Sequence, residues 1–297
     1  MSMRRRGWLR RLAVVIVGCA AVLGAQAQTE VGFDSLDRRG GQLVTLKAWW
    51  FGVDKRQAPA VVLLHGCSGP YDHLGRLGER MREYAQLFNR QGMHALVVDS
   101  LTPRGETELC TQRVGTRQVT QANRRLDALA SLHWLAQRPD VDAQRLGLVG
   151  WSNGGSTVLS ATNLRQREVR DAPLRPAFAI AFYPGCEADL RRGYQPSAPL
   201  LVMVGEADDW TPAEPCHALA ARAAQASFDS GAGSPAVQIE AYAGAYHGFD
   251  SHAPVRLRKE VPNGLHPGEG VHVGGNPEAL QRSRQRLIEF IAPWVGR

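Results

Sequence analysis

The sequence predicts an α/β fold with a mostly parallel central sheet and helices on both of its faces. From Val31 onward, short apolar runs that suit strands alternate with segments of helical periodicity, and repeated strand–helix units form parallel sheets. A Gly-x-Ser-x-Gly pentapeptide stands at one of the strand-to-helix junctions. No internal repeat or low-complexity linker interrupts this order. We therefore expect residues 28–297 to form a single domain with a substantial core.

Residues 1–27 have the pattern of a cleaved export signal. Five arginines precede an apolar run from Leu12 to Gly24, and Ala25-Gln26-Ala27 offers the small residues that a signal peptidase requires. The apolar run is too short to span a bilayer comfortably. A twin-arginine signal at Arg5-Arg6 and a lipoprotein cleavage box ending at Cys19 are open alternatives. We expect an exported, periplasmic or secreted protein without a membrane span after cleavage.

The charge of the chain changes when this segment is removed. The whole sequence has 35 Lys and Arg against 28 Asp and Glu, and residues 1–27 contribute five arginines and no acid. The mature chain is therefore nearly neutral, with 30 basic residues against 28 acidic ones. This balance gives no support to nucleic-acid binding, and we expect no nucleic-acid partner.

The strands are predicted from apolar runs that are short and often β-branched, as in buried parallel strands. The first run contains Lys47 and three consecutive aromatic residues, which favours an edge position. In chain order the expected strands are Gln42–Phe51, Ala60–Leu64, Ala95–Asp99, Leu146–Val149, Phe178–Tyr183, Leu200–Val204 and Val237–Tyr242.

The helices are predicted from apolar residues at helical spacing and from their stop signals. Gly92 ends the first such segment, and Pro139 closes the second. The expected helices are Leu74–Arg90, Val119–Gln137, a segment directly after Ser152, Pro212–Ala226 and Pro277–Trp294. Between the last strand and the last helix, residues 251–276 form a long loop rich in Gly, Pro and charge.

Ser152 lies in the pentapeptide Gly150-Trp151-Ser152-Asn153-Gly154, between an apolar strand and a helix-like segment. At such a junction the serine is held in a strained turn, and side chains at the flanking glycines would collide with the strand and helix. The serine hydroxyl then projects from the carboxyl edge of the sheet, where a histidine and an acid can activate it. A Gly/Ser loop with a capping serine is the structural alternative.

The loop His65-Gly66-Cys67-Ser68-Gly69 follows the strand at Ala60–Leu64. Negative charge that develops on a carbonyl oxygen needs N–H donors fixed in advance, and this loop and the residue after the serine are placed to supply them. We expect the oxyanion hole to consist of the backbone N–H groups of Cys67 and Asn153. We expect His65 to be a buried, hydrogen-bonded structural residue.

Two later loops supply the acid and the base. Asp208 and Asp209 follow the strand at Leu200–Val204, and Asp208 is better placed, three residues after Gly205, to orient a histidine. Asp209 is then a candidate cap for the helix near Pro212. His247 is the one histidine that directly follows a strand in the chain order Ser, Asp, His.

The remaining histidines and the aromatic and basic residues near the predicted site give weaker indications of function. His252, His266 and His272 fall in the long loop, where solvent exposure or a loop contact is expected, and their spacing fits no compact zinc pattern. We expect neither a metal nor a cofactor. Two further groups are candidates for the pocket: the aromatic residues Trp151, Tyr183, Trp210 and Phe249, and the basic residues Arg256, Arg258 and Lys259.

The segments HGCSG, GWSNGG, GEADDWTP and YHGF resemble the dienelactone hydrolase family of the α/β-hydrolase superfamily, over the chain from about Val44 to the C-terminus. The resemblance implies the α/β-hydrolase fold and a triad of Ser152, Asp208 and His247. It also implies ester hydrolysis through an acyl-enzyme. The enzyme that gives the family its name uses a cysteine nucleophile and a glutamate where Gly66 stands here. Small carboxylic esters or lactones are therefore the expected substrates, rather than dienelactone itself.

The four cysteines outside the signal segment suggest two disulfides in an exported protein. In the fold implied by the resemblance, the strands before Cys67 and before the Cys110 loop are neighbours, as are those before Cys186 and Cys216. We therefore expect the pairs Cys67–Cys110 and Cys186–Cys216. Four buried free thiols are the alternative.

Two other functions fit parts of the pattern. A peptidase of the prolyl-oligopeptidase type shares the triad order, although this chain has no propeller-sized N-terminal extension. A hydrolase-like binding protein without activity is the non-enzymatic alternative.

Overall fold

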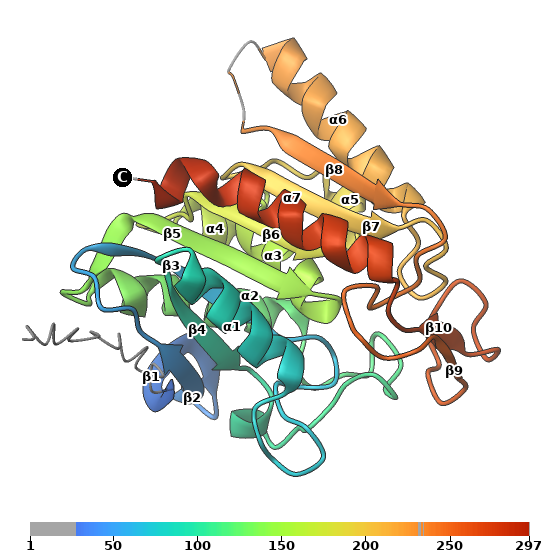
Figure 1. Cartoon of the computed structure of the whole chain (residues 1–297), viewed down its shortest axis with the longest axis horizontal. Helices are drawn as coiled ribbons and strands as arrows, with labels where there is room; N and C mark the ends of the chain where they lie inside the picture. Colours follow the sequence, from blue (N-terminus) through green and yellow to red (C-terminus); the bar gives the residue numbers. More distant parts are fainter. Residues whose placement is uncertain (1–27, 231–232, 234, 297) are drawn as a thin grey trace, which may run out of the picture.

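A computed structural model describes residues 28–230, 233 and 235–296, and the expected export signal lies outside the described residues. An eight-stranded sheet runs through the molecule in the order β1-β2-β4-β3-β5-β6-β7-β8 (Figure 1). All neighbours from β4 to β8 are parallel, while β2 is antiparallel to both β1 and β4. The strands are β1 (Gln28–Arg39), β2 (Gln42–Phe51), β3 (Ala58–Leu64), β4 (His94–Asp99), β5 (Val141–Trp151), β6 (Phe178–Phe182), β7 (Leu200–Gly205) and β8 (Val237–Tyr242).

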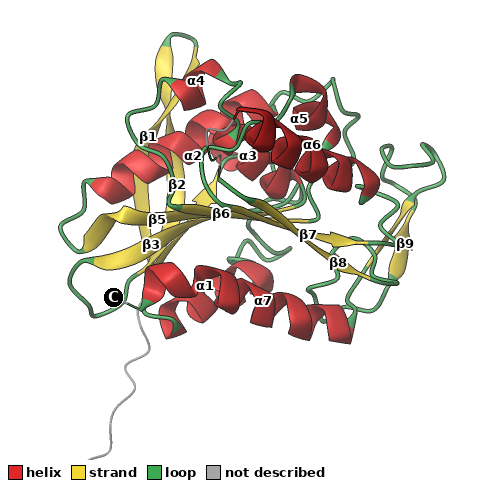
Figure 2. Cartoon of the chain, turned by 90° about the horizontal axis from the view of Figure 1, so that it is seen from above, coloured by secondary structure: helices red, strands yellow, loops and turns green. Residues whose placement is uncertain are grey.

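Helices cover both faces of this sheet (Figure 2). The helices α1 and α7 lie on one face, and α2, α3, α5 and α6 lie on the other. The helical segments are α1 (Glu79–Arg90), the 3-10 turn η1 (Thr102–Arg104), α2 (Gln121–Ala136), α3 (Asn153–Thr162), α4 (Arg167–Arg170), α5 (Glu187–Arg192), α6 (Glu214–Ser230) and α7 (Pro277–Val295). This arrangement is the α/β-hydrolase fold expected from the sequence.

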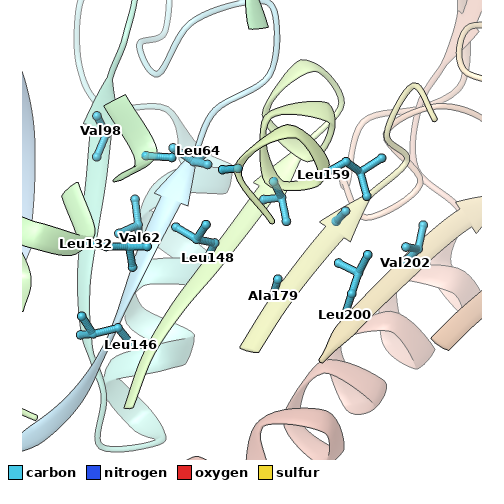
Figure 3. Close-up of a cluster of buried hydrophobic side chains, with 14 of the residues drawn as sticks. Val62, Leu64, Val98, Leu132, Leu146, Leu148, Leu159, Ala179, Leu200 and Val202 are labelled. Carbon is cyan, nitrogen blue, oxygen red and sulfur yellow. The ribbon is translucent and has the colours of Figure 1, made fainter. Parts of the chain in front are cut away.

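The central strands are apolar because both of their faces are covered. Every residue of β3, β4, β6 and β7 is buried. Alternate residues of β3 therefore belong to two different cores. Val62 and Leu64 belong to one core, which also contains Leu132 of α2 and Leu159 of α3 (Figure 3). The neighbouring side chains of the same strand belong to a second core, which contains residues of α1 and α7. The two cores hold the sheet rigid beneath the loops at its carboxyl edge.

The predicted edge position of the strand Gln42–Phe51 is wrong. This strand, β2, lies between β1 and β4, and β1 forms the edge. A buried polar cluster fastens β1 to the domain: Ser35 donates a hydrogen bond to Asp127 of α2 at 2.6 Å. The Arg104 guanidinium forms ion pairs with Asp37 of β1 and with Asp127, each at 2.8 Å.

The structure also differs from the sequence prediction in the first helix and in the long loop, and it adds β1, α4 and α5, which were not predicted. The first helix begins at Glu79 rather than at Leu74, because residues 71–78 form a turn in which Asp72 accepts hydrogen bonds from the backbone N–H groups of Leu74 and Arg76. Residues 251–276 are not loop throughout. They contain β9 (Arg256–Arg258) and β10 (Val271–Val273), which pair antiparallel and lie at the carboxyl side of the sheet (Figure 1). Among the described residues, no helix is long and apolar enough to cross a membrane.

Candidate active site

Ser152 occupies the sharp turn between β5 and α3. Its backbone has φ 54° and ψ −117°, a conformation that is costly for a residue with a side chain. The turn is this tight because the neighbouring glycines allow close contact. A Cβ at Gly150 would lie 2.2 Å from the carbonyl oxygen of Gly154, and a Cβ at Gly154 would lie 2.0 Å from that of Leu64. The pentapeptide thus adopts the strained strand-to-helix turn expected from the sequence.

The structure brings Ser152, His247 and Asp208 together from three separate loops. His247 Nε2 lies 2.8 Å from Ser152 Oγ, and His247 Nδ1 lies 2.8 Å from Asp208 Oδ2. The side chains of His247 and Asp208 are almost completely buried. This geometry lets the imidazole accept the serine proton on one nitrogen while the carboxylate orients the ring through the other.

Asp208 is held in place by the backbone of its own loop. Its Oδ1 accepts hydrogen bonds from the N–H groups of Trp210 and Thr211, both at 2.9 Å. The Thr211 hydroxyl donates to Asp208 Oδ2 at 3.0 Å and lies 3.1 Å from His247 Nδ1. The sequence prediction did not include Thr211, although its position three residues after Asp208, just before Pro212, is typical of an Asx-type turn.

The expectation that Asp209 caps a helix is wrong. The next helix begins only at Glu214, and the Asp209 carboxylate points to β10 instead. It accepts a hydrogen bond from the backbone N–H of His272 at 2.8 Å and lies 2.7 Å from His272 Nδ1. This pair joins the acid loop to the β9–β10 hairpin. Adjacent aspartates therefore contact two different histidines.

Aromatic rings enclose the His247 imidazole. Tyr183 approaches it edge-on with ring centroids 4.7 Å apart, and Trp210 lies at 4.6 Å. These rings restrict the movement of the imidazole and exclude water from one side of it. Trp151, like these two residues, also contributes to a pocket wall. Phe249, a further aromatic candidate from the sequence, is fully buried in the core and lines neither pocket described below.

The backbone N–H groups of Cys67 and Asn153 are free to act as an oxyanion hole. Within the part of the chain that the structure describes, no atom accepts a hydrogen bond from the N–H of Cys67. Asn153 is the first residue of α3, where a backbone N–H has no partner inside its own helix. Cys67 lies beside Ser152 in the wall of the same pocket. Both donors therefore belong to residues that adjoin the serine.

His65 is a buried structural residue beside this hole. Its Nδ1 lies 2.7 Å from the carbonyl oxygen of Gly66, and its Nε2 lies 3.3 Å from the backbone N of Ser100. Since the Ser100 N–H can only donate, Nε2 is the acceptor and Nδ1 carries the proton. Burial, together with the positive charge of Arg124, holds the pKa of His65 well below its ordinary value. The imidazole is thus neutral, and its Nδ1–H donates a hydrogen bond to the carbonyl oxygen of Gly66.

The structure contains both disulfides in the pairing expected from the sequence. Cys67 is bonded to Cys110 with Cα atoms 5.0 Å apart, and Cys186 is bonded to Cys216 with Cα atoms 5.1 Å apart. The first bond fixes the loop that carries one candidate oxyanion donor. The second joins the loop after β6 to α6, which follows the Asp208 loop. Both bonds lie around the rim of the site.

Two cavities flank Ser152, and both also border Cys67 and Trp210. The smaller has a volume of about 250 Å³ and includes His247 and Tyr183 in its wall. The larger, of about 730 Å³, extends along Asn153 and the residues that follow β6. The loop at residues 251–276 contributes to both walls. A substrate bound at Ser152 has room on either side of the reacting atom.

A buried carboxylate beneath the site was not predicted. Asp250 accepts hydrogen bonds from Trp151 Nε1 at 2.9 Å and from the Tyr183 hydroxyl at 2.7 Å, and it pairs with Arg80 at 3.2 Å. Asp250 therefore links Trp151, which precedes Ser152 in the sequence, to Tyr183, whose ring packs on the His247 imidazole. Its sequence signal is weak, because an aspartate three residues after a histidine has no distinctive spacing.

The other histidines and basic residues of the long loop have separate roles. His252 lies 3.6 Å from Glu83 at the surface, and His272 makes the contact with Asp209 described above. Arg258 lines the smaller cavity and pairs with Glu260 at 2.7 Å. Within the described residues, no group of three or more His, Cys, Asp or Glu side chains is arranged to hold a metal ion.

Comparisons with known proteins show the family and the fold of the chain. The model of the dienelactone hydrolase family matches residues 46–294. No curated protein matches the sequence. Among solved structures, Thermogutta terrifontis esterase 2 phosphoramylated by tabun has a TM-score of 0.59 at 17% identity, covering 90% of this chain and 96% of its own. A dienelactone hydrolase-like promiscuous phosphotriesterase from metagenomic libraries has a TM-score of 0.61 at 21% identity, covering 91% and 100%. An esterase of Pyrococcus furiosus has a TM-score of 0.61 at 17% identity, covering 91% and 94%.

Proposed function

Because the chain belongs to the dienelactone hydrolase family and is thus a carboxylic ester hydrolase, we propose that Ser152 is its nucleophile, His247 its general base and Asp208 the orienting acid. The strongest support for this proposal is the position of the His247 side chain. The imidazole of His247 bridges the serine hydroxyl and the Asp208 carboxylate at 2.8 Å on each side. These three residues come from loops that are widely separated in the sequence.

In the proposed mechanism, His247 Nε2 takes the proton of the Ser152 hydroxyl as the oxygen attacks the ester carbonyl. The proton on Nδ1 stays hydrogen-bonded to Asp208, which stabilises the imidazolium. The N–H groups of Cys67 and Asn153 stabilise the oxyanion of the tetrahedral intermediate. Collapse of that intermediate transfers the proton to the leaving alcohol and leaves an acyl-enzyme on Ser152. Attack by water, with His247 again as base, releases the acid.

The residues around Ser152 favour general esters or lactones over dienelactone as substrates. The nucleophile is a serine rather than a cysteine, and Gly66 has no carboxylate to assist a thiol. The cavities of about 250 and 730 Å³ provide separate spaces for two substituents of different size. We propose that these cavities take the acyl and alcohol portions of a small-molecule ester, without a cofactor.

We also propose that the protein is exported. The signal pattern of residues 1–27 supports this proposal, and so do the two disulfides, because such bonds persist in oxidising compartments. Residues 28–297 would then be the mature enzyme.

A hydrolysis screen tests the proposed function. The purified mature protein should hydrolyse p-nitrophenyl esters within a limited range of acyl lengths, and a panel of lactones and aryl esters would define the reaction class. The Ser152→Ala variant is the control and should lose nearly all of this turnover. Equal turnover in Ser152→Ala and the unaltered protein would contradict the assignment of the nucleophile.

A further inference from the structure

Arg124 lies behind the candidate oxyanion hole, on α2. Its side chain is completely buried. One terminal nitrogen, Nη2, donates a hydrogen bond to the carbonyl oxygen of His65 at 2.7 Å, and the other, Nη1, donates to the side-chain oxygen of Asn153. His65 and Asn153 belong to the two segments that supply the free N–H donors. A single planar guanidinium therefore connects both halves of the hole.

The surroundings of Arg124 differ from those of a structural arginine. Buried arginines are usually paired with carboxylates, and nearby Arg104 follows this rule by binding Asp37 and Asp127 at 2.8 Å each. Within the described residues, no carboxylate lies within 4.0 Å of the Arg124 guanidinium nitrogens, and its Nε has no hydrogen-bond partner. Burial lowers the pKa of Arg124 to about 10, although the carboxylates of Asp127 and Asp99 act in the opposite direction.

A buried cation without a carboxylate in direct contact destabilises a fold unless it has another use. A neutral side chain could bind the carbonyl oxygen of His65 and the side-chain oxygen of Asn153 at a lower desolvation cost. The positive charge of Arg124 lies behind the N–H groups of Cys67 and Asn153. During acyl transfer, negative charge develops on the substrate oxygen at these N–H groups, where the guanidinium can help to stabilise it. Arg124 itself lines neither cavity, but it contacts Asn153, the residue after Ser152, and His65 at the start of the Cys67 loop.

The hydrogen bonds on either side of Gly66 show how Arg124 acts on the Cys67 donor. Arg124 holds the carbonyl oxygen of His65, and the His65 imidazole holds the carbonyl oxygen of Gly66. The second of these carbonyls belongs to the same peptide group as the Cys67 N–H. Fixing both carbonyls sets the plane of that peptide, and hydrogen bonding at its oxygen polarises its N–H.

We propose that Arg124 is a positioning residue of the oxyanion hole, which keeps the Cys67 and Asn153 N–H groups at a fixed separation and places positive charge behind them. This inference rests on the proposed function. Since the oxyanion forms only during reaction, the contribution of Arg124 belongs to the transition state rather than to substrate binding. Its loss should therefore lower kcat and leave KM nearly unchanged.

Steady-state kinetics of Arg124→Met and Arg124→Lys, with a p-nitrophenyl ester as substrate, test this proposal. We expect kcat of Arg124→Met to fall by about 10- to 100-fold, below the loss of a whole donor, with KM within about threefold of the original. Arg124→Lys should retain part of the activity. Affinity for an aryl trifluoromethyl ketone, which forms an oxyanion on Ser152, should fall in parallel with kcat/KM. Arg104→Met is the matched control, since it removes a buried arginine that contacts neither donor.

Chemical rescue separates positioning from a merely structural role. Guanidinium ion at millimolar, non-denaturing concentration should restore part of kcat in Arg124→Ala and leave Arg104→Met unchanged. If Arg124→Met does not fold, Asn153→Ala removes only the anchor on α3. It should lower kcat, and Arg124→Lys in that background should then add little, because coupled residues are not additive.

Two results would overturn the proposal. One is that the Arg124 variants lose thermal stability while kcat and trifluoromethyl ketone affinity per folded molecule stay unchanged. The other is that only KM rises. Failure of the proposed function gives a different result, because the unaltered protein would then neither hydrolyse the ester nor bind the ketone.

Discussion

Asp208 and Asp209 are adjacent in the sequence, yet their carboxylates contact different histidines. Asp208 lies 2.8 Å from the imidazole that reaches Ser152, whereas Asp209 lies 2.7 Å from His272 in the β9–β10 hairpin. The two carboxylates are held by different partners: Asp208 by the N–H groups of its own loop, and Asp209 by the backbone N–H of His272. The chemistry of the site therefore depends on the direction of one carboxylate.

Substituting each aspartate by asparagine tests this division of roles. We expect Asp208→Asn to lower kcat by roughly 10³- to 10⁴-fold, because an amide cannot stabilise the imidazolium and can favour the wrong tautomer. Asp209→Asn should keep kcat within about tenfold, since it changes only a tether to His272. The measurement is steady-state kinetics on one ester. Near-normal turnover in Asp208→Asn together with loss in Asp209→Asn would reverse the assignment.

Burial of His65 predicts a dependence of stability on pH. Its pKa is lowered in the folded state from the ordinary value of 6.5, so below pH 6.5 the unfolded chain binds a proton that the folded protein does not. The stabilising contribution is present above pH 6.5 and is lost as the pH falls. Between pH 7.5 and 5.5 the free energy of unfolding should therefore fall by roughly 1 kcal/mol.

Urea unfolding at these two pH values measures the effect of His65. The variant His65→Asn keeps an acceptor and a donor but does not titrate, so its stability should fall less between the two conditions by about 1 kcal/mol. An equal fall in both proteins would show that burial does not lower the pKa of His65 in the folded state.

At the scale of elements, the central strands could be predicted because burial on both faces leaves only apolar residues in them. The run Ala60–Leu64 is an example, and the structure extends it only to Ala58. The strand β1 was missed because its inward face carries Ser35 and Asp37. Their burial depends on Asp127 and Arg104 respectively, which are far away in the sequence. Local polarity therefore predicted no strand there.

The β9–β10 hairpin could not be predicted for a similar reason. Each strand has three residues and lies in a segment rich in glycine and proline. Its position depends on contacts across the sequence, such as His272 with Asp209 and the backbone bridge between Val273 and His247. In the site, the order Ser, Asp, His was readable from loop positions. Thr211, Asp250 and Arg124 were not, because their partners are set by packing.

The two disulfides fix different elements, and their removal should have different consequences. The variant Cys67→Ala/Cys110→Ala keeps the backbone N–H of residue 67 but frees its loop, so we expect lower kcat as well as lower stability. The variant Cys186→Ala/Cys216→Ala should lose a similar stability, about 2–4 kcal/mol, with a smaller change in kcat. Thermal unfolding and ester kinetics of both variants measure this contrast. Equal kcat in the first variant and the unaltered protein would show that the bond does not hold the oxyanion loop.

At the scale of the whole molecule, the parallel sheet collects Ser152, Asp208, His247 and the Cys67 loop at its carboxyl edge, where reactive residues of α/β sheets gather. Both cores are closed by helices, and the sheet is extended at one side by the antiparallel pair β1 and β2. The sheet and its helices lie beneath, and loops surround the cavities. Sequence patterns specify the rigid part well because each of its elements buries its own apolar face.

The proposed export of the chain has a direct chemical consequence. We expect the protein recovered from an exporting host to begin at Gln28, after cleavage behind Ala27, and to have no free thiol among its four remaining cysteines. Intact and peptide mass spectrometry without reduction measures both features. A chain that retains residues 1–27, or free thiols at all four positions, would contradict the proposed processing and compartment.

In the proposed mechanism, His247 activates Ser152. Labelling with a fluorophosphonate, followed by peptide mass spectrometry, tests this activation, because the reagent forms a covalent adduct with an activated serine. We predict one adduct per chain, located at Ser152, which is absent in Ser152→Ala and strongly slowed in His247→Ala. Labelling at another residue, or none in the unaltered protein, would contradict the account.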